Sequence, residues 1–160
     1  MARVTRRVAS AVTPILAVVA LGACGGGTST KEKNAYAREV NAAQTKFAST
    51  VSTAAGEESK GDRSLSRLQL TLRRFHTAVD GVVRDLRDID APSEVTTEHE
   101  RLVSVMSGYG DQIGQTIKEM RNPTPRVAER AKQRLDSAQR SVTAQVNAAI
   151  TAINVKLRDE

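Results

Sequence analysis

The chain of 160 residues carries 24 Lys and Arg against 18 Asp and Glu, a formal net charge of +6, and is long enough for one domain with a flexible tail. It has two Tyr, two Phe and no Trp, which argues against the aromatic platforms of nucleic-acid-binding proteins, so no nucleic-acid partner is expected. A single Cys excludes an internal disulfide and a CxxC metal motif.

The first 23 residues have the layout of a secretory signal peptide. Arg3, Arg6 and Arg7 form a basic start, and an apolar run of about fourteen residues follows from Val8 to Leu21. This run is shorter than the ~20 residues that a membrane-spanning helix needs. Cleavage after residue 23 would leave 21 cations against the 18 acids, so the mature domain is expected to be only mildly basic.

A four-residue motif follows at the end of the apolar run. Leu21, Gly22, Ala23 and Cys24 resemble the lipobox of bacterial lipoproteins, in which Leu, a small residue and Ala precede an invariant Cys. The resemblance implies that signal peptidase recognises the first three residues and that the Cys24 sulfur carries a diacylglycerol, which anchors the chain in the membrane. Residues 24–30 are then a flexible tether. The alternative is a chance LGAC in an ordinary signal peptide or a core helix.

Helix-period patterning fills the chain after Ser29, and no strand-like alternation persists. A first helix is predicted from about 31 to 55, and Ser29 and Glu32 have the spacing of a capping box at its start. A second helix is predicted from about 62 to 89. It carries an unbroken three–four apolar alternation: Leu65, Leu68, Leu72, Phe75, Val79, Val82, Leu86 and Ile89.

The third helix is predicted to begin at Pro92, a residue favoured at the first helical position. Its stripe contains Val95, His99, Leu102, Met106, Tyr109, Ile113, Ile117 and Met120. Gly108, Gly110 and Gly114 each weaken it by roughly 1 kcal/mol relative to Ala. These glycines therefore indicate a kink or a close approach of another helix.

The fourth helix is predicted to follow Thr124 as its N-cap, with Pro125 behind it, and to run nearly to the end of the chain on an alanine-rich stripe. Four long amphipathic helices with short connections predict an all-α fold, an antiparallel up-down four-helix bundle of residues 31–160. The alternative is an elongated coiled-coil hairpin that completes its core by dimerising.

The two histidines are the first residues to test for chemistry. A hairpin turning at residues 91–92 would place His76 level with Ser107, and His99 about 12 Å away from His76 along the axis, too far to share a metal ion. His99 lies on the apolar stripe, which predicts a partly buried ring bonded to Asp85; the alternative is a ligand-contacting or pH-responsive group. His76 is predicted at the edge of the core or exposed.

No catalytic motif is present in a suitable context, so we expect no enzyme activity, no metal and no cofactor. Cations on the second and fourth predicted helices could face anionic headgroups or acidic wall polymers. Acids are mixed among them, which favours ordinary solubilising charge. These cations are Arg73, Arg74, Arg84, Arg87, Arg126, Arg130, Lys132 and Arg134.

The corner LRDIDAPSEVTTEHERLVSVM resembles a pattern in small secreted or lipid-anchored helical proteins of actinobacteria, most of which have no assigned function. There a helix ends in Leu-x-x-Ile/Leu, a Pro opens the next helix, and a His precedes a Leu-Val pair. The matching residues here are Leu86, Ile89, Pro92, His99, Leu102 and Val103. The resemblance implies fold and location, not activity.

The sequence thus predicts a non-enzymatic, lipid-anchored helical bundle on the extracytoplasmic face of the cell membrane. It would bind a protein partner or support an envelope complex. The alternative is a carrier of a small ligand or lipid, with a pocket between helices near Gly108–Gly114. His99 and Tyr109 are the candidate contact residues for a ligand or partner.

Overall fold

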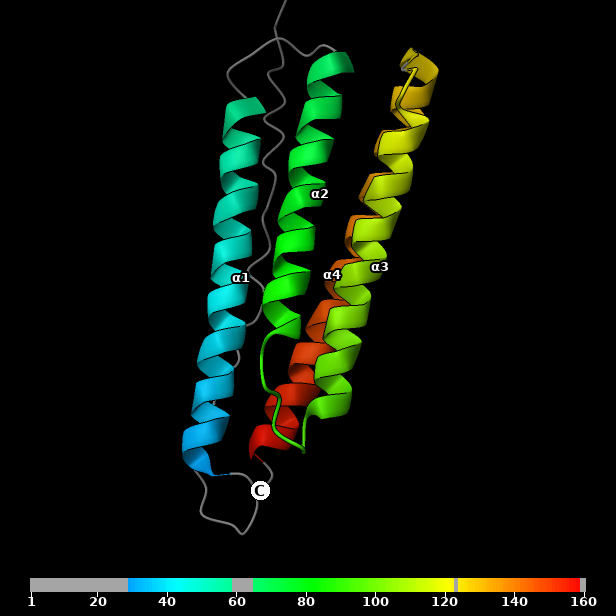
Figure 1. Cartoon of the computed structure of the whole chain (residues 1–160). Helices are drawn as coiled ribbons and strands as arrows, with labels where there is room; N and C mark the ends of the chain where they lie inside the picture. Colours follow the sequence, from blue (N-terminus) through cyan, green and yellow to red (C-terminus); the bar gives the residue numbers. More distant parts are fainter. Residues whose placement is uncertain (1–28, 59–64, 123, 159–160) are drawn as a thin grey trace, which may run out of the picture.

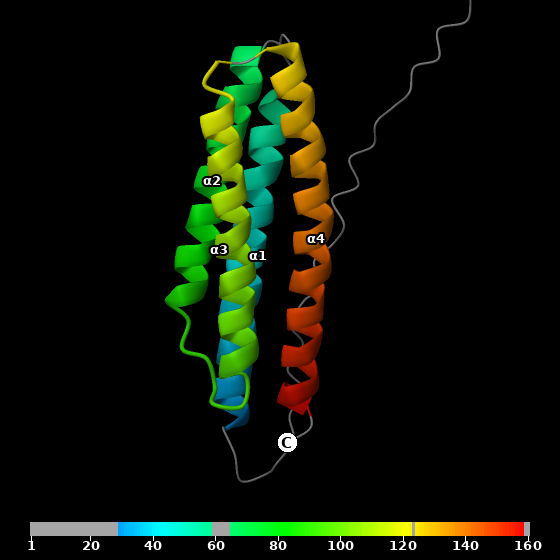
Figure 2. The ribbon, with the colours of Figure 1, turned by 90° about the vertical axis from the view of Figure 1, so that its right-hand side faces the viewer.

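The computed structural model describes residues 29–58, 65–122 and 124–158. These form four helices: α1 (Thr30–Glu58), α2 (Leu65–Arg87), α3 (Thr96–Glu119) and α4 (Pro125–Arg158). Each helix runs antiparallel to the one before it, as Figures 1 and 2 show from two sides. The predicted all-α, up-down four-helix arrangement is confirmed.

Two of the helix starts are capped as the sequence predicts. The Ser29 backbone N–H donates to Glu32 Oε2 at 2.8 Å, and the Glu32 N–H donates to Ser29 Oγ at 3.3 Å, which is a reciprocal capping box. The hydrogen bond from the Ser29 backbone lowers the pKa of Glu32. At α4, the Val127 N–H donates to Thr124 Oγ1 at 3.2 Å, so Thr124 is the cap and Pro125 the first helical residue.

The corner between α2 and α3 differs from the prediction. Pro92 does not open α3; its carbonyl accepts the Val95 N–H at 3.0 Å, Val95 is the N-cap, and α3 begins at Thr96. The connection is therefore a turn of eight residues, 88–95, between the helix ends. This extra length shifts the hairpin register. His76 lies against Gly114 instead of level with Ser107, a change of about two helical turns.

Each helix packs closely on its neighbours in the sequence, α1 on α2, α2 on α3 and α3 on α4. α3 is continuous from Thr96 to Glu119 through its three glycines. The predicted close approach of another helix is confirmed at two of these glycines. A Cβ added to Gly110 would lie 3.4 Å from Val79 Cγ1, and one added to Gly114 would lie 3.1 Å from His76 Nε2. Glycine at these two positions lets α2 and α3 come together.

The core is dense at one end of the bundle, where α1 begins and α4 ends. We call this end the closed half. Most of its large apolar side chains in the core are almost completely buried. They include Tyr36 and Val40 of α1, Leu86 of α2, and Ile150, Ile153 and Leu157 of α4.

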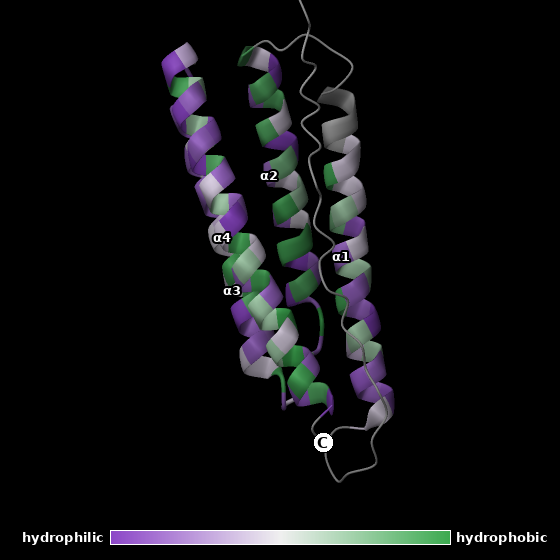
Figure 3. Ribbon diagram, turned by 180° about the vertical axis from the view of Figure 1, so that it is seen from behind, coloured by the Kyte–Doolittle hydropathy of each residue, from purple (hydrophilic) through white to green (hydrophobic). Residues whose placement is uncertain are grey.

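At the other end, which we call the open half, α1 finishes and α4 begins. The same apolar stripes continue there. Leu72, Met120 and Ala131 form a small buried cluster between α2, α3 and α4. The other members are only half-buried: Phe47, Val51, Leu68, Phe75, Leu135 and Val142. α1 and α4 diverge towards this end (Figure 1), and from behind α2 is visible between them with hydrophobic residues along its face (Figure 3). The fourth side of the bundle is therefore incompletely covered at this end.

Candidate functional site

The predicted anchor residues Leu21, Gly22, Ala23 and Cys24 lie outside the described residues. α1 begins at Thr30, so only a few residues separate Cys24 from the first helix. Of the four described helices, none combines the length and the apolar character needed to cross a bilayer.

His99 lies in the closed half at the junction of three helices. The Tyr36 hydroxyl of α1 lies 3.1 Å from His99 Nδ1, and His99 Nε2 lies 2.9 Å from the Leu86 carbonyl oxygen at the end of α2. A carbonyl can only accept a hydrogen bond, so Nε2 carries the proton and Nδ1 accepts from the Tyr36 hydroxyl. The Leu86 carbonyl also accepts the Ile89 backbone N–H at 3.2 Å, so His99 gives it a second hydrogen bond.

This geometry defines the protonation state of His99. The residue is 6% exposed, and burial lowers the pKa of its imidazole, although the hydrogen bond to the Leu86 carbonyl opposes this effect. A second proton on Nδ1 would remove the acceptor that the Tyr36 hydroxyl uses. Burial also raises the pKa of Tyr36. Neutral His99 therefore joins α1, α2 and α3 with both of its nitrogens occupied.

The sequence prediction for His99 was right about burial and wrong about the partner. Asp85 does not reach His99; its carboxylate pairs with Lys46 of α1 at 2.7 Å on the surface. The true partner, Tyr36, lies 63 residues away in the sequence.

Tyr109 is a core residue in the structure. It is 5% exposed, and its ring packs edge-on against Phe75 with centroids 5.8 Å apart. Burial raises its pKa to about 12, so the phenol is neutral at physiological pH. Its part in the structure is packing between α2 and α3.

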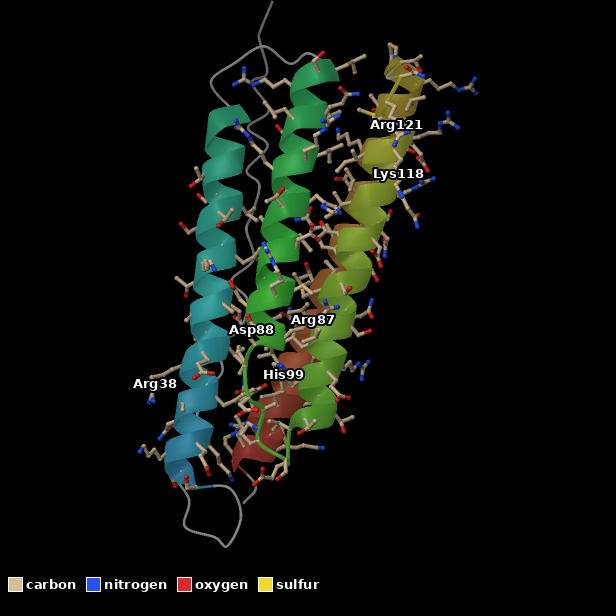
Figure 4. The ribbon with its side chains drawn as sticks, in the orientation of Figure 1. Arg38, Arg87, Asp88, His99, Lys118 and Arg121 are labelled. Atoms are coloured by element: carbon tan, nitrogen blue, oxygen red, sulfur yellow. The ribbon has the colours of Figure 1, made fainter. Side chains whose placement is uncertain are left out.

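A surface groove of about 660 Å³ lies beside His99, between the 88–95 connection and α3. We call it the corner groove. Carboxylates of Asp90, Glu100 and Asp111 and the hydroxyls of Ser104 and Ser107 line it, together with the Arg87 guanidinium. The groove is open to solvent and does not extend into the filled core. Figure 4 shows Arg87 and His99 near the connection.

A second hollow, of about 430 Å³, lies on the other side of the same connection, against the start of α1. Glu32 and Glu39 contribute acids, and Asp90 and Ala91 line both hollows. The carboxylates that line the two hollows offer hydrogen-bond acceptors to a ligand that carries hydroxyl or amino groups. Within the described ranges no three His, Cys, Asp or Glu side chains come close enough to hold a metal ion.

The corner groove does not contain a catalytic pair. Ser104 and Ser107 line it beside His99, but a serine nucleophile needs a base with a free nitrogen. Both nitrogens of His99 are already bonded to Tyr36 and Leu86. The arrangement therefore supports binding by hydrogen bonds and gives no route to serine activation.

Sequence reasoning missed the environment of His76. Its Nδ1 lies 2.9 Å from Asp80 Oδ2, one helical turn along α2, and its Nε2 faces α3 at Gly114. The contact with Asp80 could have been predicted from the His-x-x-x-Asp spacing, because residues four apart lie on one helix face. The contact with Gly114 could not, because it depends on the shifted register of α3.

Comparison of the chain with protein-family models, with curated proteins and with solved structures gives no match.

Proposed function

We propose that this protein is a lipid-anchored, extracytoplasmic helical bundle that has no enzymatic activity and binds a protein partner, alone or within an envelope complex. Diacylglycerol on Cys24 would hold it in the membrane. The proposal is supported by the order of the basic start, the apolar run and the Leu21–Cys24 motif. The start of α1 at Thr30 would then keep the bundle close to the membrane surface.

The open half is the single observation that carries the binding function. Phe47 and Val51 of α1 and Leu135 and Val142 of α4 continue the core stripes but stay half-exposed. Neighbouring apolar side chains that a monomer covers only in part can serve as an interaction site. An amphipathic partner helix laid along this side would cover what α1 and α4 leave open.

Two buried amide atoms mark where the close packing ends. Gln44 Nε2 of α1 and Asn147 Oδ1 of α4 are buried and have no hydrogen-bond partner. A buried polar group without a partner costs about 1–3 kcal/mol. A surface optimised for the stability of the isolated bundle would avoid this cost. Its presence at the border of the open half therefore supports a binding surface.

A photo-crosslinking amino acid at Val51 tests the docking surface, with the same group at Arg38 as the control, since Arg38 is exposed on the closed half of α1. In intact cells we expect Val51 and Leu135 to capture the same protein and Arg38 to capture none. Capture of different proteins at Val51 and Leu135, or equal capture at Arg38, would remove the open half as the binding surface.

Cys24→Ser tests the anchor separately. We expect the variant to accumulate as an unprocessed, unlipidated precursor that does not incorporate labelled palmitate. Thr28→Ser, a change of similar size in the tether, should be processed normally. Partition of Cys24→Ser into detergent to the same extent as the native chain would refute the anchor.

The corner groove favours a second candidate function, that of a carrier for a small ligand or lipid. Its volume of about 660 Å³ lies in the range of small-molecule sites. Native mass spectrometry of the protein purified from its own membrane distinguishes the two functions. A carrier retains a bound small molecule that Ser104→Trp displaces, whereas a partner-binding bundle has the mass of the lipidated chain alone.

A further inference from the structure

A third surface groove lies between α2 and α3 on the side of the bundle that carries His76. It has a volume of about 630 Å³ and is lined by Arg73 and His76 of α2 and by Asp111, Gly114, Ile117 and Lys118 of α3, among others. We call it the outer groove. Figure 4 labels Lys118 near the C-terminal end of α3, far from His99 at the other end of the helix.

The imidazole of His76 is held in a defined orientation. Its Nδ1 donates to the Asp80 carboxylate at 2.9 Å, and its ring is 31% exposed. Nε2 lies over Gly114, where a Cβ would approach to 3.1 Å, so the absence of a side chain there makes room for the ring. One ring nitrogen is thus fixed by the protein, and the other lies beside Gly114, which also lines the groove.

Two cations share this groove and have no acidic partner in the described part of the chain. Arg73 precedes His76 by about one turn of α2, and Lys118 follows Gly114 by about one turn of α3. Two other cations that face a neighbouring helix are paired, Lys46 with Asp85 and Lys156 with Glu98. Asp111, one turn before Gly114, is the only carboxylate among the residues that line the outer groove.

We propose that the outer groove binds an organic phosphate, with the phosphate group between Arg73, His76 Nε2 and Lys118 and with hydroxyl groups of the organic part directed to Asp111. A phosphate has enough acceptor oxygens for Arg73, Lys118 and the imidazolium form of His76, which donates from both ring nitrogens, whereas a carboxylate has only two. The groove is also far larger than a bare anion and matches the size of small-molecule sites. This inference is independent of the membrane anchor and of the open half.

The two histidines provide the measurement and its internal control. The chain contains only His76 and His99, so each ring can be followed by NMR in the full-length protein at constant pH, with His76→Gln giving the assignment. The probes are glycerol 3-phosphate, phosphatidylglycerol in nanodiscs, and glycerate. We expect the phosphate probes to move the His76 ring signals in a saturable way and to leave those of the buried His99 in place.

The soluble and the membrane probe distinguish the source of the phosphate, since a response to one alone identifies a free ester or a lipid headgroup. No saturable response to either would overturn the proposal. An equal response to glycerate would overturn the assignment to phosphate.

Charge-matched variants separate a built site from general electrostatic attraction. Arg73→Gln with Lys118→Gln should weaken phosphate-probe binding about a hundredfold, since each of the two lost charge-assisted hydrogen bonds accounts for about tenfold. Arg126→Gln with Arg130→Gln removes the same charge from exposed positions of α4 and should leave the affinity unchanged. Equal losses in both pairs would overturn the site.

Gly114→Ala tests the same site without a change of charge. The added methyl group requires the His76 ring to move by a few tenths of an ångström, so we expect the saturable His76 response to be weakened while the circular dichroism spectrum stays helical. Retention of full binding by this variant would show that His76 Nε2 does not contact the ligand.

Discussion

The closed and open halves of this bundle are built from the same four helices but packed differently. In the closed half α1 and α4 contribute fully buried side chains to one cluster, and Tyr36 and His99 join three helices by hydrogen bonds. In the open half the stripes continue with equally apolar residues, such as Phe47 and Leu135, but these stay half-exposed. An apolar stripe thus predicts which face of a helix turns inward and does not predict how completely that face is covered.

The largest effect is expected from His99→Ala in the closed half. The substitution leaves the Tyr36 hydroxyl without its acceptor, removes one of the two hydrogen bonds to the Leu86 carbonyl and opens a cavity, which should lower the free energy of unfolding by about 3 kcal/mol. Urea denaturation gives this value. A loss below about 1 kcal/mol would mean that His99 does not hold the closed half together.

A smaller loss is expected from Phe47→Ala, the comparable deletion in the open half. Phe47 is only partly buried, so the substitution should lower the free energy of unfolding by ~2 kcal/mol, about half of the usual effect for a fully buried Phe. The same urea titration compares it with His99→Ala. If Phe47→Ala were the more damaging of the two, the division into a closed and an open half would be wrong.

The pH dependence of stability reports on His99 directly. Its pKa is lowered in the folded state from the usual 6.5, so between these two values the unfolded chain binds more protons than the folded one. Stability from neutral His99 is fully present above pH ~6.5 and is lost as the pH falls through the folded pKa. Urea midpoints between pH 8 and pH 5 should therefore decrease, and His99→Gln should flatten this slope. An unchanged slope in His99→Gln would assign the acid sensitivity to other groups.

The smallest effect is expected for the ion pair between Glu98 of α3 and Lys156 of α4, whose charged atoms lie 2.9 Å apart. The hydrogen bond from Lys156 lowers the pKa of Glu98, and the Glu98 side chain is only 16% exposed. A double-mutant cycle with Glu98→Gln and Lys156→Met should give a coupling energy of about 0.5 kcal/mol. The Lys46–Asp85 pair, in which Lys46 is 68% exposed, should couple less. A larger coupling energy for Lys46–Asp85 than for Glu98–Lys156 would show that the strength of these ion pairs does not increase with burial.

Much of the fold could be predicted because its signals are local. The three–four spacing of apolar residues fixes the inward face of each helix, and side chains such as Ser29, Glu32 and Thr124 cap helix starts through bonds that span three residues. What could not be predicted depends on distant parts of the chain. Three features follow from how complete helices pack on one another. They are the Tyr36–His99 hydrogen bond, the register that brings His76 to Gly114, and the divergence of α1 from α4.

The site predictions divide in the same way. His99 and Tyr109 stand on the apolar stripe of α3, and the structure places both in the core, where one joins helices and the other packs against Phe75. The outer groove could not be predicted from the sequence, because its residues come from two helices whose observed register differs from the predicted one by two turns. Spacing within one helix shows His76 and Asp80, but the Lys118 across from them requires the fold.

The order in which the helices pack also has a kinetic consequence. Close packing joins helices that are neighbours in the chain, α1 with α2, α2 with α3 and α3 with α4. Such contacts close short loops, and proteins rich in them fold fast. Longer loops are closed where α1 meets α3, through Tyr36 and His99, and where α1 meets α4. Their entropy is recovered mainly in the closed half, where residues such as Tyr36 and Ile153 belong to one cluster. A hairpin of α2 and α3 can therefore form early, while the docking of α1 on α4 comes last and is the first step to be reversed.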